Sequence, residues 1–117
     1  MGDLLKSFRS DLVASLRRLA APANVQVLYL KDLGVYPSAD ELALEFHELA
    51  LTSRRQIVAG EISIVEGAAV ERLDRQLGNF SGRDYAFLWT ADALGSADEW
   101  RKVRASASEC LTILGET

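Results

Sequence analysis

The sequence predicts an all-α protein, an irregular or orthogonal bundle of five to six helices in a single domain over residues 1–117. Three observations predict this fold. Apolar residues recur at intervals of three and four along most of the chain, as on one face of an amphipathic helix. S-x-x-E motifs begin at Ser38, Ser63 and Ser96, and this motif is typical of the capping box at a helix N-terminus. Glycine follows several of the apolar patterns, where helices commonly end.

Composition and charge exclude several classes of protein. The chain is 49% hydrophobic and 26% charged, and none of its apolar runs approaches the roughly 20 residues that cross a bilayer. We therefore expect no membrane partner. The net charge of −4 argues against a nucleic-acid partner, which would require a basic stripe. Cys110 is the single cysteine, and the first residues lack the apolar core of a signal peptide, so we expect a cytoplasmic protein with a buried free thiol.

Two helices are predicted in the first third of the chain. The first has Asp3 as its N-cap and extends to about Leu19, with leucines along one face. Pro22 ends that pattern and begins a second helix, because it lacks an amide proton and suits the first helical turn. The second helix ends before Gly34, although its VQVLYL segment would also suit a strand. Its expected core residues are Val25, Leu28, Tyr29 and Leu33.

The longest helical pattern covers residues 38–59 and is apolar on two sides, so it is expected to have two helical neighbours. The broader side faces the core. The narrower side is a seam of Leu44, Leu51 and Val58, which are spaced by seven residues. We favour burial of this seam inside the monomer, and self-association through it is the alternative.

The last third of the chain is also predicted to be helical. A helix is expected over residues 63–77 and another opens at Ser96. Residues 84–94 fit both a strand and a helix, and we favour a helix because one lone strand would leave backbone groups unpaired. Core positions of the two flanking helices are Val70, Leu73 and Leu77, and Trp100, Val103, Ala107, Cys110, Leu111 and Leu114.

No motif in the sequence identifies a reaction. His47 and Cys110 are the only histidine and cysteine, too few for a zinc site with three or four such ligands. Glycine-rich phosphate loops and G-x-S-x-G are absent as well. We therefore predict no cofactor, no metal and no enzymatic activity, with a small enzyme using His47 and Glu48 as a less favoured alternative. His47 is expected at the border of the two apolar sides, bonded to water, backbone or a residue of a packed neighbour.

The acidic side of the 38–59 pattern is one candidate protein-binding surface. Glu41, Glu45 and Glu48 fall on one side, and residues 37–53 contain no lysine or arginine. Exposed acids would speed the encounter with a basic partner. Replacing Glu45 and Glu48 by Lys is then expected to slow association without changing the melting temperature.

An aromatic segment is the second candidate. Five of the nine aromatic residues lie between Phe80 and Trp100, and most are expected in the core. On a helix, Phe87 would point away from Trp89, and an exposed Phe87 would mark a contact surface. Phe87 and Trp89 therefore complete the candidate protein-binding residues.

These patterns predict a small, acidic, intracellular protein that acts by binding another protein, in the manner of an adaptor, regulator or immunity-type inhibitor. The partner is expected to be basic. The alternative is a homo-oligomeric structural unit, such as a homodimer joined through Leu44, Leu51 and Val58.

Overall fold

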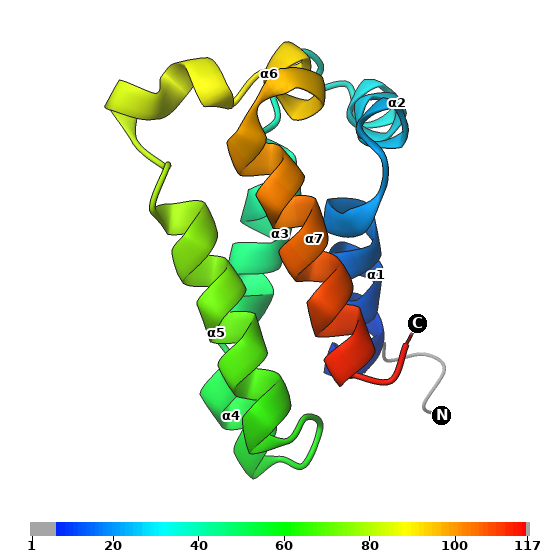
Figure 1. Cartoon of the computed structure of the whole chain (residues 1–117). Coiled ribbons are helices and arrows are strands. Elements are labelled where there is room, and N and C mark those ends of the chain that lie inside the picture. Colours follow the sequence, from blue (N-terminus) through cyan, green and yellow to red (C-terminus); the bar gives the residue numbers. More distant parts are fainter. Residues whose placement is uncertain (1–6, 117) are drawn as a thin grey trace.

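The computed structural model describes residues 7–116 (Figure 1). These residues form eight helical segments and no β-strand. They are α1 (Phe8–Ala20), α2 (Ala23–Leu33), α3 (Asp40–Ala50), α4 (Ser53–Val58), α5 (Ile64–Gly78), the 3-10 helix η2 (Arg83–Leu88), α6 (Ala91–Ser96) and α7 (Asp98–Ile113). The predicted all-α class is confirmed. The predicted number of helices is too low, because the patterns over 38–59 and 84–94 each correspond to two shorter helices.

The hydrophobic core lies among α1, α3, α5 and α7. Helix α7 contacts α1 and α5, and α3 contacts the same two helices, so the four enclose one cluster of buried residues. Helices α2 and α6 and the 3-10 helix η2 lie at one end of this arrangement, and α4 lies at the other end beside the start of α5 (Figure 1). Buried positions confirm the predicted stripes of α5 and α7: Val70, Leu73, Leu77, Trp100, Val103, Ala107, Cys110, Leu111 and Leu114.

Of the three predicted capping boxes, the one at Ser63 forms. Ser63 Oγ accepts from the Glu66 amide at 3.1 Å, and a Glu66 carboxylate oxygen accepts from the Ser63 amide at 2.8 Å. Arg9 donates to both oxygens of the same carboxylate at 3.2 Å and to the Leu114 carbonyl at 2.7 Å, which ties α1 to α5 and to the residue that follows α7. The hydrogen bonds from Arg9 lower the pKa of Glu66. The stabilisation they provide is present above the carboxylate's ordinary pKa and is lost as the pH falls through the lowered value.

The other two predicted capping boxes are wrong, because their serines make different contacts. Ser38 Oγ accepts from the Asp40 amide at 3.2 Å, and the Ser38 backbone forms an isolated bridge to Thr90. Ser96 Oγ donates to the Asp92 carbonyl at 3.0 Å, so that Ala97 becomes the N-cap of α7. At the start of the chain, the predicted N-cap Asp3 lies outside the described residues, and Ser7 caps α1 instead.

The predicted single helix over residues 38–59 is also wrong, since a turn at Leu51 and Thr52 separates α3 from α4. The Thr52 hydroxyl donates to the Leu49 carbonyl at 3.0 Å, and the Thr52 amide bonds to the same carbonyl at 3.1 Å. Such local bonds compete with the α-helical ladder. Helix α4 then packs closely on α5 because position 67 is glycine: a Cβ added at Gly67 would lie 2.5 Å from the Ile57 side chain.

Helix α2 buries a different face from the one predicted. Its fully buried side chains are Gln26 and Leu30, whereas Val25, Leu28 and Leu33 are exposed and Tyr29 is half-buried. The Gln26 amide group donates to the carbonyls of Arg18 and Leu19 at 3.1 Å each, so it satisfies acceptors at the end of α1. An amide that caps another helix therefore determines the orientation of α2.

Cys110 is buried as predicted, at 4% exposure, and its thiol lies 3.5 Å from the Ala69 carbonyl. Burial raises the pKa of the thiol to about 11, which keeps it protonated at neutral pH. The thiol thus contributes to packing between α5 and α7. Separately, none of the helices in residues 7–116 combines the length and apolar character that a membrane span requires.

Candidate functional site

An open groove runs between α3 and α5 and ends at the segment around η2. Its volume is about 810 Å³, compared with about 390 and 350 Å³ for two other hollows on the protein. One stripe of α3 lines the groove, with the spacing i, i+3, i+4 and i+7: Asp40, Ala43, Leu44 and His47. A matching stripe comes from α5 and the residues after it: Asp74, Leu77, Gly78 and Ser81. Helix α3 thus presents a row of side chains two turns long, which faces a row that begins on α5 and continues past the end of that helix.

Most of the groove surface is apolar or carries small side chains. Leu44 is 52% exposed although it is a leucine in the middle of a helix. Ala43, Gly78 and Ala86 keep the groove open because their side chains are short or absent. On a helix face that is exposed to water, long polar side chains usually occupy such positions. A surface of this kind is typical of a binding site.

Trp89 forms one end of the groove and is held there by several contacts. Its indole N–H donates to the Phe80 carbonyl at 2.8 Å, and its ring stacks on that of Phe80 with centroids 5.2 Å apart. The Trp89 carbonyl accepts from the Ala39 amide at 3.1 Å, and the Ala91 amide donates to the Pro37 carbonyl at 2.8 Å. These backbone bonds attach the start of α3 to the η2–α6 segment, which fixes the position of Trp89 relative to α3.

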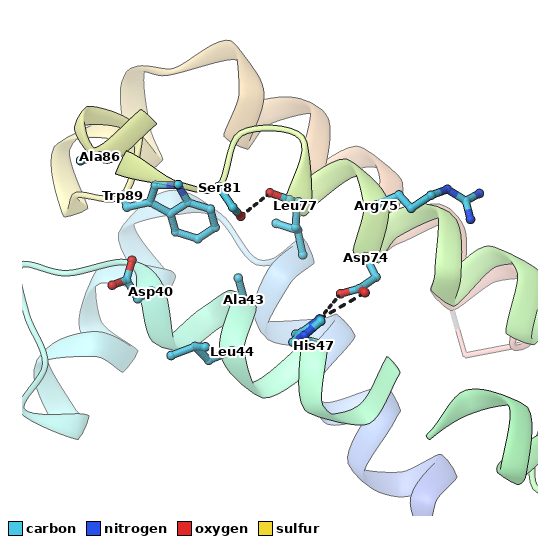
Figure 2. Close-up of a pocket in the computed structure, with 12 residues that line it drawn as sticks. Asp40, Ala43, Leu44, His47, Asp74, Arg75, Leu77, Ser81, Ala86 and Trp89 are labelled. Atoms are coloured by element: carbon cyan, nitrogen blue, oxygen red, sulfur yellow. Dashed lines mark hydrogen bonds and ion pairs between the residues drawn. The ribbon is translucent and has the colours of Figure 1, made fainter. Parts of the chain in front are cut away.

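His47 and Asp74 meet at the other end of the groove, as Figure 2 shows. His47 Nδ1 lies 2.9 Å from one Asp74 oxygen and 3.2 Å from the other. The prediction of a partner from a packed neighbour is therefore confirmed for His47. Because an ionised carboxylate can only accept, His47 Nδ1 is assigned as the donor in this contact.

The His47–Asp74 pair resembles the orienting contact of a catalytic histidine, but the remaining groups of such a site do not gather around it. Among the described residues, Asp74 supplies the one side chain within hydrogen-bonding distance of the His47 ring. Ser81 donates to the Leu77 carbonyl at 2.8 Å, and Glu48 lines a different hollow. His47 and Glu48, the pair considered for an enzyme, are thus not brought together in one pocket.

The three acids of the candidate binding surface lie on another side of α3, toward α1 and α2. Glu45 accepts from Arg18 Nε at 3.1 Å and from the Tyr29 hydroxyl, and Arg18 also lies over the Tyr29 ring, 5.0 Å from its centroid. Burial, together with the bond to Glu45, raises the pKa of Tyr29 to about 12. Glu48 is exposed and Glu41 is half-buried. The charge of Glu45 is therefore neutralised within the protein.

The two candidate aromatics lie beside the groove rather than with the acids. Trp89 lines the groove and is partly buried, whereas Phe87 is 68% exposed on η2, which also supplies Ala86 to the groove. Phe80 and Trp100 belong to the core and Trp89 packs against it, as expected, whereas Tyr85 is 42% exposed, so the expected core position is wrong for Tyr85. The expected exposure of Phe87 is confirmed.

The seam residues are all exposed, so the favoured prediction of burial inside the monomer is wrong. Leu44 is 52% exposed, Leu51 71% and Val58 90%. The turn at Leu51 changes the direction of the chain, and the α3–α5 groove contains Leu44 without the other two. Leu44, Leu51 and Val58 therefore do not form one continuous seam, although they are spaced by seven residues.

Sequence reasoning missed the contribution of α5 to this site. Asp74 lies on a helix whose apolar pattern was assigned to the core, and nothing near it in sequence indicates His47 as its partner. Gly78 is the last residue of α5 and lines the groove. Ala43 packs against the core as well as lining the groove, so its small side chain gave no separate signal of an open surface.

No three His, Cys, Asp or Glu side chains within residues 7–116 gather closely enough to hold a metal ion. In comparisons with known proteins, the chain matches no family model, no curated protein and no solved structure. Its function is therefore inferred from the groove and the residues around it.

Proposed function

We propose that this protein acts without catalysis, by binding another protein in the α3–α5 groove, in the manner of an adaptor, regulator or inhibitor. The observation that carries the proposal is the apolar groove itself, in which Leu44 stays 52% exposed between two helices. Removing such a surface from water favours association by roughly 25 cal/mol per Å² of apolar area. The free, buried thiol of Cys110 fits a reducing compartment such as the cytoplasm.

A protein suits this site better than a small molecule because an exposed aromatic side chain, Phe87, lies outside the groove lining. Phe87 is exposed on η2, next in sequence to Ala86 in the groove lining. Exposed aromatic side chains are typical anchors of protein interfaces. A small ligand within the groove would leave Phe87 in water, whereas a protein segment with its flanking surface can cover both.

Replacing Leu44 by Glu is expected to weaken partner binding at least tenfold. The change removes an apolar contact and would bury a charge in the interface, and each effect is worth about 1 kcal/mol or more. Because Leu44 is exposed, the melting temperature should change little. The measurement is quantitative affinity capture from extracts of the cells that make the protein, compared between the original protein and the variant.

Leu51→Glu is the matched control. Leu51 lies seven residues further on, is 71% exposed and does not line the groove, so this variant should keep the partner. Proteins captured equally by the original protein and by Leu44→Glu would contradict the proposal. Loss of the partner with both variants would place the interface elsewhere on this side of the molecule.

Self-association is the second candidate function, and one observation favours it. Val58, Ile64 and Val65 are 90%, 75% and 67% exposed where α4 meets the start of α5. Single exposed apolar residues are common on protein surfaces, but three near the same turn suggest a contact surface. The mass in solution tests this candidate: a dimer that Val58→Glu dissociates would favour it, and a monomer at all concentrations would exclude it.

A further inference from the structure

We infer that the occupant of the α3–α5 groove is an amphipathic helix of the partner protein, with two basic residues about two turns apart on either side of apolar ones. This inference rests on the proposed function and adds the chemistry of the partner. The basic residues would pair with Asp40 and Asp74, and the apolar residues between them would contact Leu44 and Leu77.

The geometry of the lining argues for a helix. Asp40 and His47 are seven residues apart on α3, which corresponds to about 10 Å along its axis. The opposite side begins at Asp74 on α5 and continues past the end of that helix to Ser81. A helix lying between the two sides would present its own residues i, i+3, i+4 and i+7 to both rows. The short side chains of Ala43 and Gly78 let its backbone approach closely.

An extended peptide has less to bind to here. A strand gains most of its affinity by pairing with the exposed edge of a sheet. Both long walls of this groove are helices, whose backbone groups are already bonded along their own axes. The one bridge in the described residues, between Ser38 and Thr90, belongs to the connection that holds Trp89.

The charges at the two ends argue for basic residues in the occupant. Asp40 is exposed, and its carboxylate has no hydrogen-bond or ion-pair partner among residues 7–116. Asp74, whose side chain is 24% exposed, accepts from His47 Nδ1 through its carboxylate oxygens at 2.9 and 3.2 Å. Arg75 also lines the groove, but Figure 2 shows its side chain pointing away from His47 and Asp74.

The two acids mark the ends of the groove rather than its middle. In Figure 2, Asp40 lies near Trp89, whereas Asp74 lies at the opposite end above His47, with Leu44 and Leu77 between them. A helix that is apolar in its central turn and basic before and after it would match this order. Acidic residues at the same places would meet like charges, which gives specificity as well as attraction.

A displayed library of single-helix peptides tests the inference. Each peptide has about four turns, an alanine-rich framework and random residues at i, i+3, i+4 and i+7; the whole 117-residue chain is the target and its Leu44→Glu variant removes binders to other sites. We expect selected peptides to carry Lys or Arg at i and i+7 and aliphatic residues between them. Changing both basic residues of a selected peptide to Glu should weaken binding about tenfold or more at low salt.

A charge exchange gives the decisive control. Asp40→Lys should weaken the basic peptide and partly restore the peptide that carries Glu at the facing position, whereas Glu48→Lys, on another side of α3, should change neither. Selected helices that need Leu44 but show no preference for basic residues would overturn this inference and leave the proposed function intact. Failure to select any helix that needs Leu44 would also overturn it, and capture of the partner from cell extracts would then decide the proposed function separately.

Discussion

Replacing Trp100 by Ala should lower the free energy of unfolding by roughly 4–8 kcal/mol. The side chain is fully buried, its indole N–H donates to the Leu88 carbonyl at 2.6 Å, and its ring packs edge-on against Phe80 and Trp89 with centroids 5.5 and 5.1 Å apart. Truncating a core tryptophan to alanine costs about 3–5 kcal/mol, and leaving a buried carbonyl unpaired adds about 1–3 kcal/mol. Urea unfolding followed by far-ultraviolet circular dichroism measures the change.

Trp100→Phe extends this test if the alanine variant does not fold. Phe keeps an aromatic ring but cannot donate to Leu88, so the loss should be smaller, roughly 1–3 kcal/mol. Because Trp89 follows Leu88 in the chain and lines the groove, this variant should also weaken partner binding. An alanine variant within about 1 kcal/mol of the original protein would show that Trp100 is not the centre of this core.

Replacing Glu45 by Lys should lower the free energy of unfolding by about 1–3 kcal/mol, even though its neighbours in sequence suggested an exposed acidic surface. Its carboxylate accepts from Arg18 and from the Tyr29 hydroxyl, and the three side chains are only partly exposed. Breaking a fully buried pair costs more, about 3–5 kcal/mol, and partial exposure to solvent reduces that figure. The lysine would also face Arg18, a like charge.

Glu48→Lys is the control for this prediction, because it makes the same change of charge three residues later on the same helix. Glu48 is exposed and makes no ion pair in the described residues, so its replacement should change the free energy of unfolding by less than about 0.5 kcal/mol. With roughly 4 °C expected per kcal/mol, thermal melts separate the two variants. Equal melting temperatures for the two variants would contradict this prediction and would show that Glu45 behaves as an exposed surface acid.

The helical fold could be predicted where apolar residues recur on a single face of the helix. In α5 and α7 the leucines and Trp100 recur on one face. Apart from Ile64, Val65 and Ile113 at the helix ends, the exposed positions are polar or small, so the buried side is clear. In α2 apolar residues occupy nearly all sides, and the orientation depends on Gln26 bonding to carbonyls of α1, which no periodicity indicates. Likewise, Ser38 has the sequence of a capping box but bridges to Thr90, which is distant in the chain.

The candidate site could be predicted only in part. The sequence indicated that Phe87 would be exposed and that His47 would take its partner from a packed neighbour. It could not indicate Asp74 as that partner, because their meeting depends on how α3 and α5 pack. The groove exists because α3 and α5 are held apart along one side while their other sides share the core, and this separation is a property of the assembled helices.

Photo-crosslinking in the cells that make the protein tests the groove interface most directly. A photoreactive benzoylphenylalanine is placed at position 44, in the groove, or at position 28 on α2, where Leu28 is 59% exposed and does not line it. Irradiation should join position 44 to one partner protein, and the same adduct should be absent from position 28. Crosslinks to that partner from position 28 alone, or equally from both positions, would contradict binding in the α3–α5 groove.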